Sequence, residues 1–173
     1  MNQPLAEEIR LFEEEMIRQE PWEGSLDLPR RLRWAKPSSV YASLRVLVAE
    51  DDPTLRRLLS LILRREGHEV VEARDGTELL EALAATLVDA RLRPFDLVVC
   101  EQQLPGMPGL CVLAGLRVRD ESTGFVLLTE NAELQRRARE LSAVALPAPF
   151  TLRAFQAAVR ESAQQRPAND NAR

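Results

Sequence analysis

Hydrophobic and polar residues form two alternating patterns after Leu44. Short apolar runs predict five β-strands, at 44–49, 69–73, 96–100, 125–129 and 143–146. Between them, apolar residues recur every three or four positions, which predicts helices at about 53–66, 77–92, 110–119, 131–141 and 151–164. A chain in which strands and helices alternate predicts a parallel sheet that is covered by helices on both faces.

Residues that start or stop helices mark the first of these helices. Asp52 precedes Pro53, as expected for an N-cap residue followed by proline at the first helical position. Gly67 follows the last apolar residue of the periodic segment, where a glycine often ends a helix. We therefore expect this helix to run from Pro53 to about Glu66.

A separate helical pattern lies near the N-terminus. Leu5, Ile9, Phe12 and Met16 recur at spacings of four, three and four, and the opposite side is rich in glutamate, which predicts an amphipathic helical arm over 1–20. A helix this short is marginal on its own in water. Its apolar stripe is therefore expected to pack on the main domain, on its copy in a homodimer, or on a partner protein.

The remaining segments divide the chain into four parts. Residues 21–43 are rich in proline and serine and are expected to form an extended linker, and the polar residues 166–173 a disordered tail. The main domain is expected over 44–165. The linker holds basic residues and two tryptophans, which can indicate nucleic-acid contact, but the net charge of -4 argues against a nucleic-acid partner.

The composition narrows the class of protein further. It is 45% hydrophobic and 29% charged, as in ordinary globular proteins. No apolar run approaches the roughly 20 residues that span a bilayer, and the N-terminus lacks a signal-peptide pattern. Cys100 and Cys111 have no metal-ligand spacing. We therefore expect a cytoplasmic protein with reduced thiols and no membrane association.

Carboxylates stand at the ends of two predicted strands. Glu50 and Asp51 follow the first strand, and Glu101 follows the third. In open parallel α/β sheets, binding sites lie at the carboxyl ends of the strands. The sequence therefore predicts one acidic pocket built from distant segments, and crowded carboxylates favour either a bound cation or a proton.

Five segments together resemble the receiver domain of response regulators, such as the chemotaxis response regulator. They are VLVAEDDP at 46–53, DG at 75–76, FDLVVCEQQLPGMPG at 95–109, FVLLT at 125–129 and PAPF at 147–150. The resemblance covers about 44–164. It implies a flavodoxin-like (βα)5 fold, with a doubly wound five-stranded parallel sheet in the order 2-1-3-4-5.

The resemblance also implies a set of site residues. In the family, an acidic pair and an aspartate bind Mg²⁺, and the aspartate accepts a phosphoryl group from a histidine kinase. The acidic pair corresponds to Glu50 and Asp51, and the hydroxyl that contacts the phosphoryl group corresponds to Thr129. Glu50, Asp51 and Glu101 are therefore possible Mg²⁺ ligands, aided by the carbonyl of Gln103, although no cofactor is required.

Three positions depart from the family pattern. Glu101 stands at the phosphoacceptor aspartate, Ala148 at the lysine, and Ala145 at the switch aromatic. A glutamate carboxylate reaches about 1.5 Å further than that of aspartate, and a misplacement of about 1 Å can slow phosphoryl transfer on the order of a hundredfold. We therefore expect a degenerate pseudo-receiver that is not an enzyme and has no catalytic residue. Glu101 either imitates a phosphoryl group and sets an active-like state, or is a relic.

The leading functional expectation is an atypical, stand-alone response regulator that acts by protein–protein interaction, since few residues follow the last helix. The partner would be a histidine kinase or a downstream regulator. It would bind the face of the domain's fourth helix, fifth strand and fifth helix, about 131–164, or the N-terminal arm; a homodimer is an alternative. A conventional Mg²⁺-dependent phosphoacceptor with autodephosphorylating activity is the second hypothesis. A flavodoxin-like binder of small ligands is the third, although no glycine-rich loop for a nucleotide follows the first strand.

Overall fold

The computed structural model describes residues 43–120 and 122–165 of the chain. In these residues five parallel strands form one sheet in the order β2-β1-β3-β4-β5. The strands are β1 (Arg45–Ala49), β2 (Glu69–Ala73), β3 (Leu97–Glu101), β4 (Gly124–Thr129) and β5 (Val144–Pro147). The helices are α2 (Pro53–Arg65), α3 (Gly76–Val88), α4 (Gly109–Arg117), α5 (Ala132–Glu140) and α6 (Leu152–Gln165).

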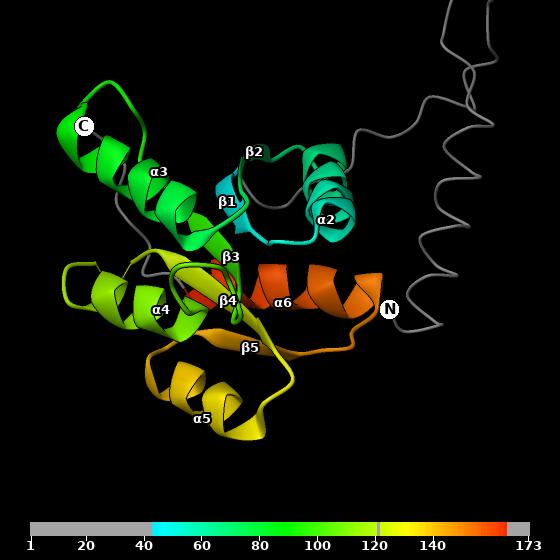
Figure 1. The fold of residues 1–173 in the computed structure, drawn as a ribbon. Helices are drawn as coiled ribbons and strands as arrows, with labels where there is room; N and C mark the ends of the chain where they lie inside the picture. The colour runs from blue at the N-terminus through cyan, green and yellow to red at the C-terminus, as the bar shows by residue number, and fades with distance from the viewer. Residues whose placement is uncertain (1–42, 121, 166–173) are drawn as a thin grey trace, which may run out of the picture. The chain divides into compact units, whose positions relative to one another are not determined.

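The helices cover both faces of the sheet. Figure 1 shows α2 and α6 on one face and α3, α4 and α5 on the other. The predicted doubly wound parallel sheet and its strand order are therefore confirmed. Every residue of β4 is buried, as are four of the five residues in β1 and β3, because a parallel sheet between two helical layers has no solvent-facing side. The edge strand β2 is more exposed.

Side-chain caps fix where three of the helices begin. Asp52 accepts hydrogen bonds from the backbone N–H groups of Thr54 and Leu55 at 2.7 and 3.1 Å, so the predicted N-cap is confirmed. Asp75 and Asn131 cap α3 and α5 in the same way. These caps place α2, α3 and α5 directly after the carboxyl ends of β1, β2 and β4.

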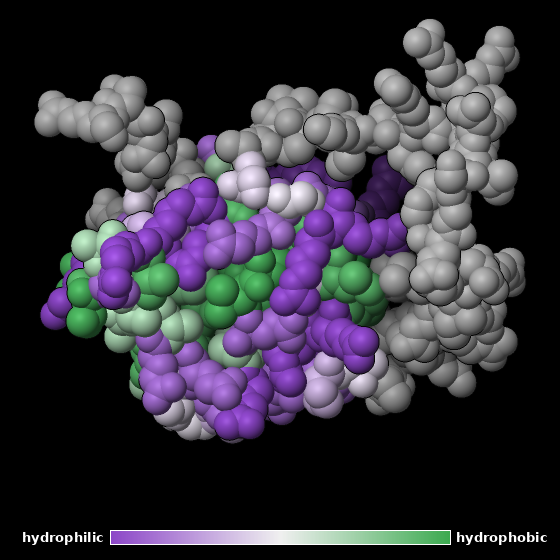
Figure 2. Space-filling model, turned by 90° about the horizontal axis from the view of Figure 1, so that it is seen from above, coloured by the Kyte–Doolittle hydropathy of each residue, from purple (hydrophilic) through white to green (hydrophobic). Residues whose placement is uncertain are grey.

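The prediction for the second helix was wrong at its C-terminal end. The apolar pattern predicted a helix to residue 92, but α3 ends at Val88 and Asp89 caps it. The side chain of Asp89 accepts a hydrogen bond from the Arg91 N–H at 3.0 Å, a local turn that competes with helix continuation. The apolar side chains there stay in solvent: Leu87 is 76% exposed and Val88 is 87% exposed. Figure 2 shows hydrophobic atoms at the surface on the left, the side on which Figure 1 places the end of α3.

Part of the predicted organisation falls outside the described residues. This concerns the arm with Leu5, Ile9, Phe12 and Met16, the linker up to residue 42, and the tail from 166. Within 43–120 and 122–165, no helix combines the length and apolar character that a bilayer crossing demands.

Candidate functional site

Three neighbouring strands end at one edge of the sheet and carry polar residues there. Glu50 directly follows β1, Glu101 is the last residue of β3, and Thr129 is the last residue of β4. The structure therefore extends β3 by one residue beyond the predicted strand end. Six predicted site residues line one pocket of about 660 Å³ at this edge: Glu50, Asp51, Glu101, Gln103, Thr129 and Ala148.

Glu50 is the most buried acidic residue of the pocket, with 3% of its surface exposed. Its Oε1 accepts a hydrogen bond from the Asp52 N–H at 3.2 Å, whereas its Oε2 has no hydrogen-bond partner. Burial raises the pKa of Glu50 to about 8, and the nearby charges of Glu101 and Asp51 act in the same direction. The protonated form of Glu50 therefore predominates at neutral pH.

Glu101 is half-buried, and its carboxylate turns back toward its own loop. Its Oε1 accepts a hydrogen bond from the Gln103 N–H at 3.1 Å. Burial raises the pKa of Glu101, and the hydrogen bonds from the backbone of Gln103 and Gln102 partly oppose this shift. One oxygen of this carboxylate is thus already used within the loop.

Gly109 allows the loop after β3 to pack against the strand end. A Cβ atom at this position would lie 2.6 Å from the Glu101 carbonyl oxygen and 2.8 Å from the Leu127 side chain. The Gly109 N–H also donates to the Gln102 carbonyl at 3.0 Å, which closes the loop. Only glycine fits this close approach, and the loop that it closes holds Gln103 at the pocket.

Thr129 ends β4 with its hydroxyl engaged locally. It is 3% exposed, and its Oγ1 accepts a hydrogen bond from the Asn131 N–H at 3.3 Å. Its carbonyl oxygen accepts from the Gln135 side chain at 3.1 Å and from the Ala148 N–H at 3.3 Å. These contacts join the ends of β4 and β5 to the start of α5.

The two alanines at departing positions lie in different surroundings. Ala148 follows β5, is half-buried, and lines the pocket next to a cis peptide bond with Pro149. Ala145 lies within β5 and does not line the pocket. It lines a separate groove of about 430 Å³, together with Arg139 and Glu161.

The pocket carboxylates do not form a metal cluster. Among residues 43–120 and 122–165, no three His, Cys, Asp or Glu side chains gather closely enough to hold a metal ion. Arg56 donates to the backbone carbonyls of Glu50 and Asp51 at 2.6 and 3.3 Å, so a cation already contacts the backbone at this strand end. Glu50, Asp51 and Glu101 therefore line one pocket without forming a metal cluster of three carboxylates.

Sequence reasoning missed four residues that also line the pocket: Gln102, Glu130, Asn131 and Leu134. Glu130 and Asn131 directly follow Thr129, so their place at the end of a strand was a signal available in the sequence. Leu134 lies one turn into α5, and only the packing of that helix brings it to the pocket.

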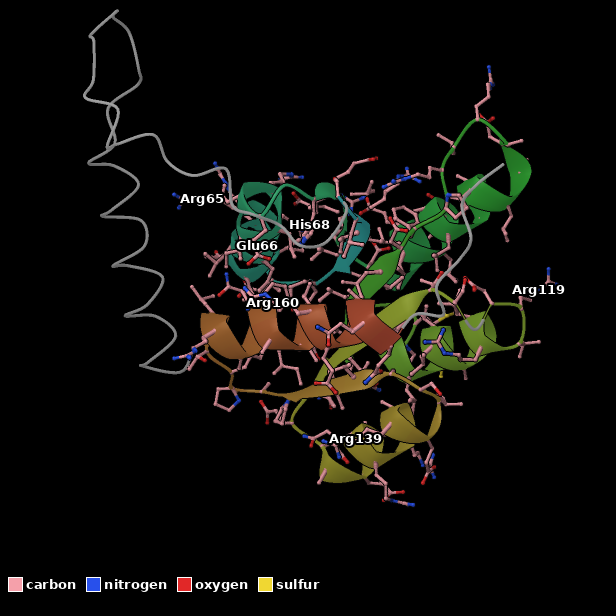
Figure 3. All side chains as sticks on the ribbon, turned by 180° about the vertical axis from the view of Figure 1, so that it is seen from behind. Arg65, Glu66, His68, Arg119, Arg139 and Arg160 are labelled. Carbon is pink, nitrogen blue, oxygen red and sulfur yellow. The ribbon has the colours of Figure 1, made fainter. Side chains whose placement is uncertain are left out.

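A second charged cluster lies on the other side of the domain and has a structural role. Figure 3 labels Glu66, His68 and Arg160 there, at the junction of α2 and α6. Glu66 accepts hydrogen bonds from the side chains of Gln156 at 2.8 Å and Arg160 at 3.3 Å. The Nδ1 of His68 accepts from the Leu44 N–H at 3.3 Å, and burial lowers the pKa of this imidazole. The contacts of Glu66 attach α6 to the end of α2, and the contact of His68 attaches the start of β2 to the residue before β1.

Comparison with known proteins agrees with this geometry. The family model described as the response regulator receiver domain matches residues 46–148. The transcriptional activator protein PfeR of Pseudomonas aeruginosa is 38% identical over 113 residues, which cover 64% of this chain and 34% of PfeR. The DNA-binding response regulator MtrA of Mycolicibacterium smegmatis is 38% identical over 89 residues, which cover 51% of this chain and 36% of MtrA. The matched region thus spans about a third of these relatives.

Solved structures show the same fold. The non-phosphorylated HemR receiver domain of Leptospira biflexa matches with a TM-score of 0.59 at 28% identity, covering 70% of this chain and 94% of that domain. The chemotaxis response regulator CheY4 of Vibrio cholerae matches with a TM-score of 0.59 at 23% identity, covering 70% of this chain and 99% of CheY4. Since the family model also matches more than half of the sequence, this chain belongs to the response regulator receiver domain family, which acts in two-component signalling.

Proposed function

We propose that this chain is an atypical receiver that signals through protein contacts without conventional phosphorylation. The observation that carries this proposal is the composition of the pocket. Four acidic residues line it, and none of the described lining residues is basic. Phosphoryl transfer depends on positive charge placed around the transferring group. A pocket of this composition repels the incoming phosphoryl group instead of stabilising it.

The position of Glu101 supports the same proposal. Resemblance to the family assigns the phosphoacceptor position to Glu101, whose side chain is longer than that of aspartate. Its Oε1 is hydrogen-bonded to the Gln103 N–H, so the carboxylate is held toward its own loop. An attacking oxygen must be aligned with the phosphorus atom, and misalignment slows transfer steeply.

Output through a protein surface follows from this proposal. The face of α5, β5 and α6 is the first candidate, because it carries the groove that Ala145, Arg139 and Glu161 line. The N-terminal arm with its apolar stripe is the second candidate, either for a partner or for a homodimer. The partner would be a histidine kinase or a downstream regulator. DNA binding is named for MtrA as a whole, and the matched region covers only 36% of that protein.

The decisive experiment is phosphoryl uptake from acetyl phosphate with Mg²⁺, measured by intact-protein mass. We expect no mass gain for the wild type, and a gain of about 80 Da, one phosphoryl group, for the double variant Glu101→Asp/Ala148→Lys. The single variants Glu101→Asp and Ala148→Lys serve as controls. They show whether the missing aspartate or the missing lysine prevents phosphoryl uptake in the wild type. A mass gain in the wild type would contradict the proposal.

The second candidate function is a phosphoacceptor with unusual chemistry. The observation in its favour is that Thr129 and the acidic pair at Glu50 and Asp51 line the same pocket as Glu101. If the wild type takes up phosphate and Glu101→Gln does not, this second function replaces the first. Loss of the label over time would then report autodephosphorylation.

A further inference from the structure

We propose that the amphipathic arm predicted over 1–20 docks its apolar stripe into an apolar groove between α3 and α4 of the same chain. This inference goes beyond the proposed function, since it holds whether or not Glu101 accepts a phosphoryl group. It rests on the exposed apolar surface at the groove, on matching residue spacings, and on the place where the chain enters the domain. A partner that binds the stripe or the groove must then displace the arm.

The groove has a volume of about 560 Å³ and lies between two helices. Its lining is mainly apolar. Leu80, Leu83 and Leu87 line it on α3, and Val112 and Leu116 line it on α4. A groove of this kind is the usual receptor for an amphipathic helix, which places apolar residues at spacings of three and four into it.

Exposed apolar side chains gather near this groove. In the described part of the chain, the exposed large hydrophobic residues all lie on α3, just after it, or at the end of α4: Leu80, Leu87, Val88, Leu92 and Val118. Leu80 and Leu87 line the groove itself. Single exposed apolar residues are common, whereas a group of them in one region indicates an interaction site.

The arm repeats the spacing of the apolar residues on α3. Three leucines of α3 line the groove at spacings of three and four: Leu80, Leu83 and Leu87. Ile9, Phe12 and Met16 recur in the arm at the same spacings. At a rise of about 1.5 Å per residue, a helix over 9–16 and the segment 80–87 each span about 10 Å. The two sets of side chains can therefore meet in three successive layers.

The chain enters the domain beside this groove. Ser43 is the first described residue, and Arg45 begins β1. The guanidinium of Arg45 lies 4.3 Å from the centre of the Phe95 ring, and Phe95 lines the groove. The linker residues 21–42 can span up to about 70 Å when extended, so they can return the arm to this place. A tether of this kind gives a millimolar effective concentration, which favours the arm of the same chain over that of a second copy.

The charge at the groove fits an acidic helix. The described lining residues include two charged ones, Arg119 and Asp120. The carboxylate of Asp120 already accepts hydrogen bonds from the backbone at 122–123, whereas Arg119 is exposed, and Figure 3 shows it on the outside of the domain at the end of α4. In a helical arm, Glu8 and Glu15 flank one edge of the stripe and Glu13 the other. A glutamate of the arm can therefore pair with Arg119.

Cys111 provides the measurement, because it is exposed and lines the groove while Cys100 is buried. The test is the rate at which Cys111 of the full chain reacts with dithiodipyridine, a neutral thiol reagent. A docked arm protects the thiol. We expect Phe12→Asp to raise the rate about tenfold, which corresponds to about 1.4 kcal/mol spread over the three layers. Leu11→Asp places the same charge off the stripe and should leave the rate unchanged.

A charge reversal tests the same contact from the side of the domain. Arg119→Glu places a carboxylate at the groove, where it repels the acidic arm, and should raise the rate for Cys111 about threefold. Arg139→Glu makes the same change of net charge at an exposed position of α5 outside this groove. This control should leave the rate unchanged.

Disulfide trapping separates the arm of the same chain from that of a second copy. Phe12→Cys is expected to form a disulfide with Cys111 under mild oxidation in air, and the product should remain a monomer on a non-reducing gel. Glu14→Cys places a thiol on the opposite side of the arm and should react about tenfold more slowly, because its thiol points away from the groove.

Two outcomes would overturn the proposal. If Cys111 reacts at the same rate in the wild type and in Phe12→Asp, the arm does not cover the groove, which is then left to a separate partner protein. If the disulfide of Phe12→Cys is found mainly in a covalent dimer, the occupant is the arm of a second copy. Neither measurement involves phosphoryl transfer, so failure of the proposed function would leave both of them interpretable.

Discussion

The Oε1 of Glu50 accepts a hydrogen bond from the Asp52 N–H at 3.2 Å. Asp52 in turn caps α2 through its own side chain. The buried end of β1 is thus connected to the first turn of a helix through one carboxyl group. The other oxygen of Glu50 faces no donor, so the group is held in place without being stabilised as an anion.

The first prediction is that stability falls as pH rises from about 5 to about 8. The pKa of Glu50 is raised from 4.5 to about 8 in the folded chain, so between these values the folded state holds a proton that the unfolded state has lost. Unfolding then releases this proton, and the free energy of unfolding drops by up to about 1.4 kcal/mol per pH unit. The raised pKa of Glu101 acts in the same direction.

Urea unfolding of the wild type and of Glu50→Gln at several pH values measures this effect. The amide cannot ionise, so the stability of the variant relative to the wild type should increase with pH across this window. Glu81→Gln, an exposed position on α3, is the matched control. A constant difference between Glu50→Gln and the wild type would show that Glu50 titrates normally.

The second prediction concerns magnesium. Since the three carboxylates do not converge, millimolar Mg²⁺ should give no binding heat and no rise in the unfolding midpoint beyond that of sodium chloride at equal ionic strength. Isothermal titration and thermal unfolding measure these two quantities. A rise that disappears in Glu50→Gln would instead establish the Mg²⁺ site that the family resemblance implies.

The sheet was predictable because its signals are local and strong. Continuous apolar runs of four to six residues, such as Leu97 to Cys100, are typical of strands buried on both faces, and Asp52 before Pro53 marks a helix start. The acidic pocket was predictable for the same reason. Glu50 and Glu101 directly follow such runs, and parallel strands end at one edge of the sheet.

Other features depend on tertiary packing and could not be predicted. The sequence does not show that Leu134 lines the pocket, or that the Oε2 of Glu50 has no hydrogen-bond donor. The end of α3 could not be predicted because Leu87, Val88 and Leu92 continue the apolar pattern, although Leu87 and Val88 stay largely exposed. Periodicity reports where a helix is possible, whereas the Asp89 turn decides where it stops.

The third prediction follows from this end of α3. Leu79 is fully buried, while Leu87 is 76% exposed on the same helix. Leu79→Ala should lower the free energy of unfolding by about 2–5 kcal/mol, because it leaves a cavity in the core. Leu87→Ala should change it by no more than about 0.5 kcal/mol. Urea denaturation of both variants measures the difference, and a large loss in Leu87→Ala would reveal a burial that the described residues do not provide.

The fourth prediction concerns two glycines of α4, Gly109 and Gly115. A Cβ atom at Gly109 would lie 2.6 Å from the Glu101 carbonyl oxygen, so Gly109→Ala must displace the loop or the end of β3. We expect a loss of about 1–3 kcal/mol. Gly115 has no atom within 4 Å of its added Cβ, so Gly115→Ala should stabilise the helix by about 0.5–1 kcal/mol. Urea unfolding of both variants measures whether each substitution lowers or raises the free energy of unfolding.

Because the displaced loop carries Gln103, Gly109→Ala should also shift the amide resonance of Gln103, whereas Gly115→Ala should leave it in place. Equal stability of the two variants would mean that the loop after β3 is not held against the strand, and that the position of Glu101 is not fixed by it.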